Sequence, residues 1–140
     1  MKILLAVDGS AYTQHMLNYL AKHQTWLVAS NVFTVFYASE PLPHLSAAAQ
    51  TIEKVRGMYQ EDAELVFKPI RKFLHQHGVL ADYVFEIGPA GSHIAQFAQK
   101  GHFDLIVMGS HGHGSVANLI MGSVATQVLS LCKTPVLLIR

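Results

Sequence analysis

The chain has 140 residues, of which 51% are apolar and 14% charged, and its formal net charge is +1. This composition provides ample core and argues against a disordered chain, and the scattered lysines and arginines give no support to a nucleic-acid-binding surface. The single cysteine, Cys132, excludes an internal disulfide and a cysteine-rich zinc site, and no apolar run approaches the ~20 residues that span a membrane.

The first third of the chain predicts two strands and a helix. Residues 3–7 form a continuous apolar run, which is typical of a central parallel strand covered on both faces. Ser10 is a good N-cap for a helix over about residues 11–24. A run rich in β-branched and aromatic residues then predicts a strand over residues 32–37, and two prolines predict a loop over residues 39–46.

The middle of the chain predicts a long helix, a strand and a shorter helix. Apolar residues at helical spacing indicate a helix over about residues 47–77, in which Pro69 should cause a kink or separate two abutting helices. A third strand is expected over residues 82–87. Ser92 is a candidate cap for a helix that runs to residue 100, and Gly101 should end it in the C′ position.

The last third completes an alternating pattern. Residues 105–108 predict a fourth strand, a helix that starts at residue 116 or later runs to residue 131, and residues 136–139 predict a last strand. This order predicts one α/β domain over residues 1–140, with a five-stranded parallel sheet and helices on both faces. The strand order 3-2-1-4-5 would place the ends of the first and fourth strands side by side, where such sheets bind ligands.

The stretch from Gly109 to Ser123 predicts a phosphate-binding loop. Glycines let backbone amides approach an anion, and the helix start that follows offers unpaired donors and a positive dipole end. The loop contains no Gly-Lys-Ser/Thr sequence of the Walker type, and no Gly-x-Gly-x-x-Gly follows the first strand. No lysine or arginine lies between Lys100 and Lys133, so backbone amides, the helix dipole and the Ser123 hydroxyl would hold the phosphate. The alternative is a tight loop whose glycines serve only its backbone geometry.

The spacing Gly109-x-x-Gly112, nine further residues, then Gly122-Ser123 resembles the ATP-binding signature of the universal stress proteins. Further matches extend along the whole chain: Val7-Asp8-Gly9-Ser10, Gly88-Pro89, Asp104-Leu105-Ile106-Val107-Met108-Gly109-Ser110-His111-Gly112 and Thr134-Pro135-Val136-Leu137-Leu138-Ile139. The resemblance implies a Rossmann-like, cytoplasmic, ATP-binding stress-response protein, usually a homodimer.

The resemblance also implies which residues bind the nucleotide, whether ATP, ADP or AMP. They are Ala6, Val7, Asp8, Tyr37, Met108, Gly109, His111, Gly112, Gly122, Ser123 and Val124. Asp8 would lie beside the ribose and, through water, hold a divalent ion (Mg or Mn), and the backbone at Tyr37 would read the adenine edge. The last strand, residues 136–139, would pair with its copy in a homodimer, which would cover an apolar edge.

The Asp8 carboxylate, the loop histidines and the function each have alternative interpretations. Asp8 could instead cap the turn that contains Gly9. His111 and His113 have metal-ligand spacing without a clear third ligand nearby in the sequence; contact of His111 with phosphate and exposure of His113 to solvent are expected. The function predicted is nucleotide-dependent binding of a partner or a second copy, and no catalytic residue is assigned. The alternatives are a slow ATPase or nucleotidyl-transfer enzyme, and an interaction protein with a vestigial loop.

Overall fold

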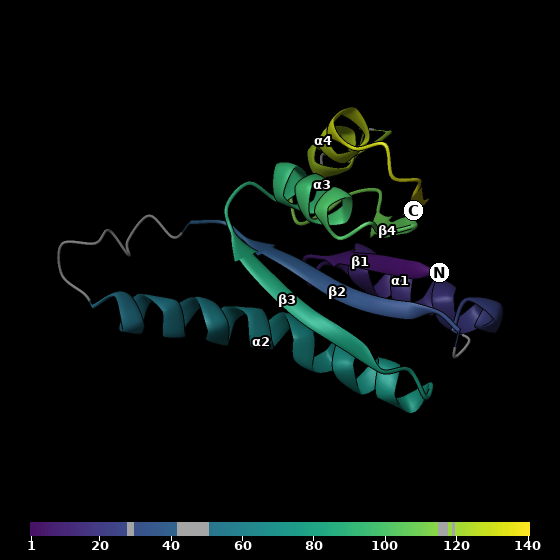
Figure 1. The fold of residues 1–140 in the computed structure, drawn as a ribbon, viewed down its shortest axis with the longest axis horizontal. Coiled ribbons are helices and arrows are strands. Elements are labelled where there is room, and N and C mark those ends of the chain that lie inside the picture. Colours follow the sequence, from purple (N-terminus) through teal and green to yellow (C-terminus); the bar gives the residue numbers. More distant parts are fainter. Residues whose placement is uncertain (28–29, 42–50, 115–117, 119) are drawn as a thin grey trace.

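The computed structural model describes residues 1–27, 30–41, 51–114, 118 and 120–140. It contains five strands that alternate with four α-helices, with one short 3-10 helix (Figure 1). In chain order these are β1 (Lys2–Val7), α1 (Ala11–Lys22), η1 (Gln24–Trp26), β2 (Val32–Ser39), α2 (Ile52–Gln76), β3 (Ala81–Ile87), α3 (Ala90–Lys100), β4 (Leu105–Gly109), α4 (Ser123–Leu131) and β5 (Val136–Ile139). All strand pairs are parallel in the order β3-β2-β1-β4-β5, which confirms the predicted α/β fold.

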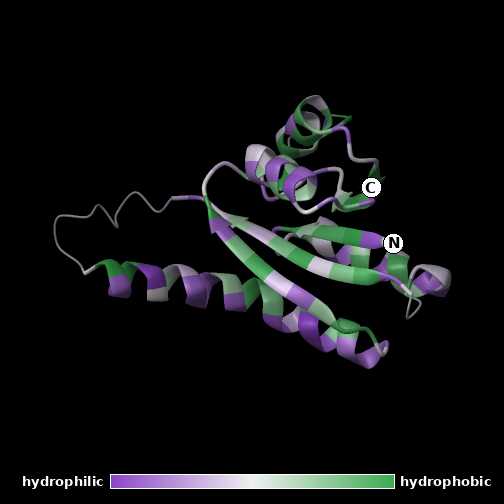
Figure 2. Ribbon diagram, viewed as in Figure 1, coloured by the Kyte–Doolittle hydropathy of each residue, from purple (hydrophilic) through white to green (hydrophobic). Residues whose placement is uncertain are grey.

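Helices cover both faces of the sheet. Along β1, Ile3, Leu5 and Val7 pack into the cluster that α1 and α2 cover, whereas Leu4 and Ala6 pack into the cluster under α3 and α4. Figure 2 shows the corresponding hydropathy, with largely hydrophobic strands and a long α2 that alternates between hydrophobic and hydrophilic residues. A central strand buried on both faces explains why the sequence of β1 is continuously apolar.

The strand register brings the functional segments to one edge of the sheet. Val7 pairs with Tyr37 on β2, Ala6 pairs with Met108 on β4, and Gly109 pairs with Ile139 on β5. The carboxyl ends of these four strands therefore lie side by side. The first turns of α2 project beyond this same end of β3 (Figure 1).

The structure corrects the expectation for Pro69 in part. The residues around it form a single helix, α2, rather than two abutting helices. Pro69 is exposed, and Leu65, four residues earlier, is 77% exposed. Pro69 has no N–H group to donate to the Leu65 carbonyl, and the exposure of Leu65 lets this carbonyl bond to water instead. The expected loop at 39–46 and the start of the long helix fall largely outside the described residues.

The two ends of α3 also differ from expectation. The helix begins at Ala90 with Pro89 as its N-cap, and the Ser92 hydroxyl donates to the Pro89 carbonyl from within the first turn. At the other end, Gly101 has a right-handed φ of −82°, and His102 takes the left-handed conformation with φ 51°. Among the described residues, no helix is long and apolar enough to cross a membrane.

Candidate functional site

The turn after β1 is fixed by the Asp8 side chain. Its Oδ1 atom accepts hydrogen bonds from the Ser10 amide at 2.9 Å and the Thr13 hydroxyl at 3.0 Å. The Thr13 hydroxyl oxygen in turn accepts from the amides of Asp8 and Gly9, both at 3.2 Å. Ser10 caps α1 as predicted, because its hydroxyl accepts from the Tyr12 amide. One carboxylate oxygen of Asp8 therefore has the turn-capping role weighed as the alternative.

The second carboxylate oxygen of Asp8 faces the glycine loop. A Cβ atom placed on Gly112 would lie 2.5 Å from Asp8 Oδ2, so only glycine fits this position without displacing a neighbour. Within the part of the chain that the structure describes, no group donates a hydrogen bond to Oδ2. The loop and the end of β1 thus meet at a carboxylate oxygen that can still accept a hydrogen bond.

His113 connects the same two segments. Its side chain is exposed, as expected, yet Nε2 lies 2.8 Å from the Asp8 carbonyl oxygen. A carbonyl oxygen can only accept, so Nε2 carries the proton in this contact. This contact has no signal in the sequence, because the two residues lie 105 positions apart in the chain.

The loop is closed where α4 begins. The Gly122 amide donates to the Ser110 carbonyl at 2.7 Å. A Cβ on Gly122 would lie 3.1 Å from both His111 Cα and the Ser110 carbonyl oxygen. The Gly122 amide is therefore already engaged within the loop. Close packing explains the glycine at this position.

The donors that remain belong to the first turn of α4. Ser123 is its first residue and Val124 its second, and no side chain caps this end of the helix. Amides in the first turn have no partner within an α-helix. The first turn contains no acidic residue, so nothing on the helix itself counters the positive end of its dipole.

His111 packs against the start of α1. Its Nδ1 lies 2.9 Å from the Ser110 hydroxyl oxygen, and its ring centroid lies 5.2 Å from that of Tyr12. Gly109 makes this contact possible, because a Cβ there would lie 2.6 Å from Tyr12 Cβ. Gly109 thus allows close packing between the end of β4 and α1.

The end of β2 carries a polar cluster that sequence analysis missed. The hydroxyls of Tyr37 and Ser39 both donate to Asp62 Oδ2 on α2, at 3.0 Å and 3.2 Å. Burial raises the pKa of Tyr37 to about 12, aided by its hydrogen bond to the Asp62 carboxylate, by that group's charge and by the charge of Asp8. The Tyr37 hydroxyl therefore lies in the field of both carboxylates. No local signal marks Asp62, since only the packing of α2 on the sheet brings it here.

The predicted residues are distributed around one edge of the sheet. All eleven lie at the carboxyl ends of β1, β2 and β4, in the loop after β4, or at the start of α4. The side chains of Ala6 and Met108 are buried together on the α3 and α4 face. The Tyr37 ring lies on the opposite face, against Phe67 of α2. It is therefore separated by the sheet from the Met108 side chain.

The described residues contain no group of three or more histidine, cysteine, aspartate or glutamate side chains that could hold a metal ion. Within this part of the chain, a divalent ion near Asp8 would need further ligands from water or from a bound phosphate.

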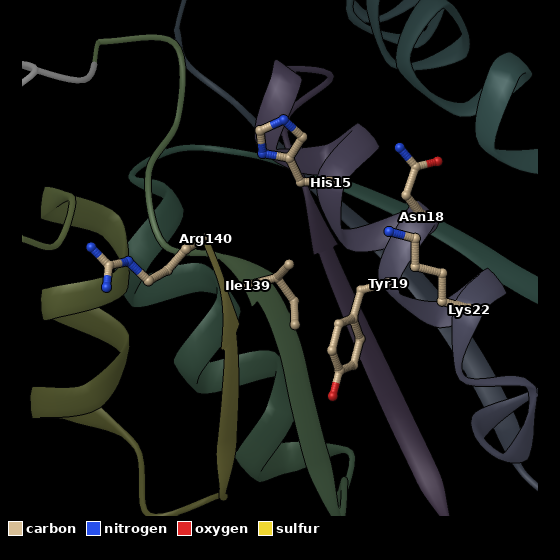
Figure 3. A pocket seen from close by; sticks show the side chains of 6 residues that line it. All are labelled: His15, Asn18, Tyr19, Lys22, Ile139 and Arg140. Carbon is tan, nitrogen blue, oxygen red and sulfur yellow. The ribbon is translucent and has the colours of Figure 1, made fainter.

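A separate pocket lies between α1 and the end of β5 (Figure 3). Its lining residues are His15, Asn18, Tyr19, Lys22, Ile139 and Arg140. None of the eleven predicted residues is among them. The Arg140 side chain points away from α1 in Figure 3, so the basic side chains of this pocket do not converge on one point.

Residues 1–140 match the universal stress protein family, and the chain belongs to this family. It is 30% identical over 139 residues to universal stress protein Slr1230 of Synechocystis, which covers 99% of this chain and 42% of that protein. It is 27% identical over 144 residues to universal stress protein MJ0531 of Methanocaldococcus jannaschii, covering 99% of this chain and 81% of that protein. The chain thus spans less than half the length of the Synechocystis relative.

Solved structures share the fold. The structure of protein MJ0577 matches with a TM-score of 0.83 and 22% identity, over 99% of this chain and 94% of that chain. An Arabidopsis thaliana protein of the family, solved with AMP bound, matches with a TM-score of 0.69 and 15% identity, over 99% and 90%. The Archaeoglobus fulgidus universal stress protein in complex with dAMP matches with a TM-score of 0.61 and 20% identity, over 100% and 98%.

Proposed function

We propose that this chain binds an adenine nucleotide, ATP with ADP or AMP as alternatives, between the end of β1 and the loop after β4. The AMP and dAMP complexes of structures with the same fold support the choice of nucleotide. The shared edge of Asp8, Gly112 and the start of α4 supports the position. This is a binding function, and the eleven predicted residues remain its proposed site.

The phosphates would lie against the loop and α4. The amides of Ser123 and Val124 and the dipole of α4 favour an anion at this point. Since no lysine or arginine lies between Lys100 and Lys133, a Mg or Mn ion would supply the missing positive charge. The free oxygen of Asp8 faces the loop and would bind that ion through water.

The adenosine would lie toward the strand ends. Ala6 and Met108 pair across β1 and β4, and Val7 pairs with Tyr37 across β1 and β2. Their backbones would form the floor of the adenosine site, and the backbone at Tyr37 would contact the adenine edge.

Nucleotide binding would change the association of this chain with a partner, and we propose that this partner is a second copy that pairs through β5. β5 pairs only with β4 among the described strands, and its residues Val136, Leu137 and Leu138 are half-buried. An apolar edge strand of this kind is suited to pairing with a second copy. We place this function in stress response in the cytoplasm, with which a single cysteine is compatible.

One observation carries the proposal: Gly112 lies so close to Asp8 Oδ2 that the glycine loop and the end of β1 are in direct contact. Isothermal titration of the full chain with ATP, ADP and AMP, with and without Mg²⁺, tests it. Saturable heat and a raised Tm are expected with at least one nucleotide. No heat and no change in Tm with any of the three would overturn the proposal.

A further inference from the structure

The Asp62 carboxylate lies at the site edge of the sheet. Asp62 precedes Val66 by one turn of α2, and Val66 contacts the turn after β1, because a Cβ on Gly9 would lie 3.3 Å from Val66 Cγ2. One turn earlier along α2 is one turn further toward the end of the helix that projects beyond the strands (Figure 1). Asp62 therefore lies at the carboxyl ends of β1 and β2, beside the proposed adenosine site.

Two hydroxyls fix the orientation of this carboxylate. Tyr37 and Ser39 both donate to Oδ2, so this oxygen faces β2. Among the described residues, no group donates to Oδ1. Asp62 is half-buried, and an ionised carboxylate is an acceptor only. The side chain thus presents one oriented acceptor next to the strand end.

The position of Tyr37 and Ser39 indicates which part of a nucleotide would contact the Asp62 carboxylate. Tyr37 and Ser39 lie on either side of Ala38, at the end of β2 where the adenine edge is proposed to lie. Adenine carries an amino group at its 6-position, which donates hydrogen bonds, whereas hypoxanthine carries a carbonyl oxygen there, which accepts them. A carboxylate pairs with the amino group, as acidic side chains pair with amino groups on base edges, and leaves a carbonyl oxygen unpaired.

We propose that Asp62, held by Tyr37 and Ser39, selects 6-amino purines by accepting a hydrogen bond from the amino group of adenine. This inference rests on the proposed nucleotide site and adds its base specificity. The proposed hydrogen bond involves only the 6-position of the base. A change of base with the same ribose therefore distinguishes this role of Asp62 from binding of the ribose hydroxyls. A 6-oxo purine would lose the hydrogen bond and meet the carboxylate with a second acceptor.

The unmodified protein tests the inference first. Isothermal titration compares AMP, IMP and N6,N6-dimethyl-AMP, which share the ribose and the phosphate. Binding of AMP at least about tenfold tighter than the other two is expected, because a hydrogen bond to a charged group is lost in each. Equal affinities for AMP and IMP would overturn the role of Asp62. An absence of binding by all three and by ATP would instead overturn the proposed nucleotide site.

The variant Asp62→Asn gives an independent test. If the amide oxygen keeps the hydroxyls of Tyr37 and Ser39, its nitrogen takes the ligand-facing position and donates. The preference should then shift from AMP toward IMP, with an AMP to IMP ratio at least about tenfold lower than in the parent chain. Glu61→Gln is the matched control, because Glu61 is the exposed neighbour on α2 and loses the same charge.

Two results of the variant test would overturn the inference. One is an equal loss of affinity for AMP and IMP in Asp62→Asn, which would indicate a contact with the ribose or a structural role. The other is the same change of ratio in Glu61→Gln, which would indicate a general charge effect. Far-UV circular dichroism and Tm establish that both variants fold. Should Asp62→Asn not fold, the comparison of the three ligands on the parent chain decides.

Discussion

Gly112 is the residue on which the geometry of the proposed site depends most directly. In Gly112→Ala the new methyl group would lie 2.5 Å from Asp8 Oδ2, so the carboxylate or the loop must move. We expect nucleotide affinity to fall by about tenfold or more, measured by isothermal titration. Gly114→Ala is the matched control, since a Cβ there meets no atom within 4 Å. Equal affinities of the two variants would contradict the prediction.

Tyr37 provides a second prediction at the scale of a residue. Because its pKa is raised to about 12 from 10.0, its contribution to stability is complete below pH 10 and is lost as pH rises toward 12. Tyr37→Phe leaves Asp62 Oδ2 with one hydroxyl donor and should cost about 1–2 kcal/mol at pH 8. The difference in unfolding free energy between the two proteins should then narrow as pH rises from 10 to 12.

Urea denaturation at each pH measures this difference, and ultraviolet absorbance of ionised tyrosine reports the titration itself. Tyr37→Phe should lack the tyrosine that ionises near pH 12 in the parent chain. A stability difference that stays constant or grows with pH would contradict the assigned contact with Asp62.

At the end of α3, the residue with the positive φ follows the glycine that the sequence predicts for that position. Gly101 matches the usual C′ glycine, yet its φ is −82° and His102 has the positive φ. The glycine is required by packing, because a Cβ there would lie 2.5 Å from the Phe103 ring and 3.0 Å from the Phe97 carbonyl oxygen. The helix-end pattern does not reveal this requirement, because the requirement arises from the packing of the Phe103 ring against Gly101.

Substitutions at Gly101 and His102 should change the stability of the fold in opposite directions. Gly101→Ala should destabilise the fold by about 1–3 kcal/mol through overpacking against Phe103. His102→Gly should stabilise it by about 0.5–1 kcal/mol, because glycine adopts a positive φ without steric cost. Urea denaturation of both variants measures the changes. The opposite order of stabilities would indicate that Gly101, and not His102, occupies the left-handed position.

The sequence-based predictions were accurate for features that depend on local patterns, and they missed contacts between segments that are distant in the chain. The type and order of the five strands and four α-helices were predicted from their apolar patterns, and a parallel sheet was predicted from their alternation. The strand order 3-2-1-4-5 was a further prediction, which the structure confirms. The proximity of Asp8 to the glycine loop followed from that order. Asp62, and the contact of His113 with the Asp8 carbonyl, depend on side-chain packing between distant segments, so the sequence contained no local signal for them.

At the scale of the whole molecule, Ser110 connects the proposed site to the edge of the sheet. Its amide donates to the Ile139 carbonyl of β5 at 2.8 Å, and its own carbonyl accepts from the Gly122 amide at the start of α4. A ligand that fixes the loop would therefore also fix the end of β5. If β5 pairs with a second copy, nucleotide affinity and dimer affinity must change each other by the same factor.

The backbone of β5 allows the proposed dimer to be tested without altering its pairing with β4. The carbonyl of Pro135 accepts from the Ile106 amide of β4, and the carbonyl of Ile139 accepts from the Ser110 amide just after β4. The alternation of a strand therefore directs the N–H group of Leu138 toward the free edge. Leu138→Pro removes that donor, whereas Leu138→Ala truncates the same side chain and retains the donor. Sedimentation equilibrium should show a dimer dissociation constant at least about tenfold higher for the proline variant than for the alanine variant. A parent chain that is monomeric, or two variants that dimerise equally, would contradict pairing through β5.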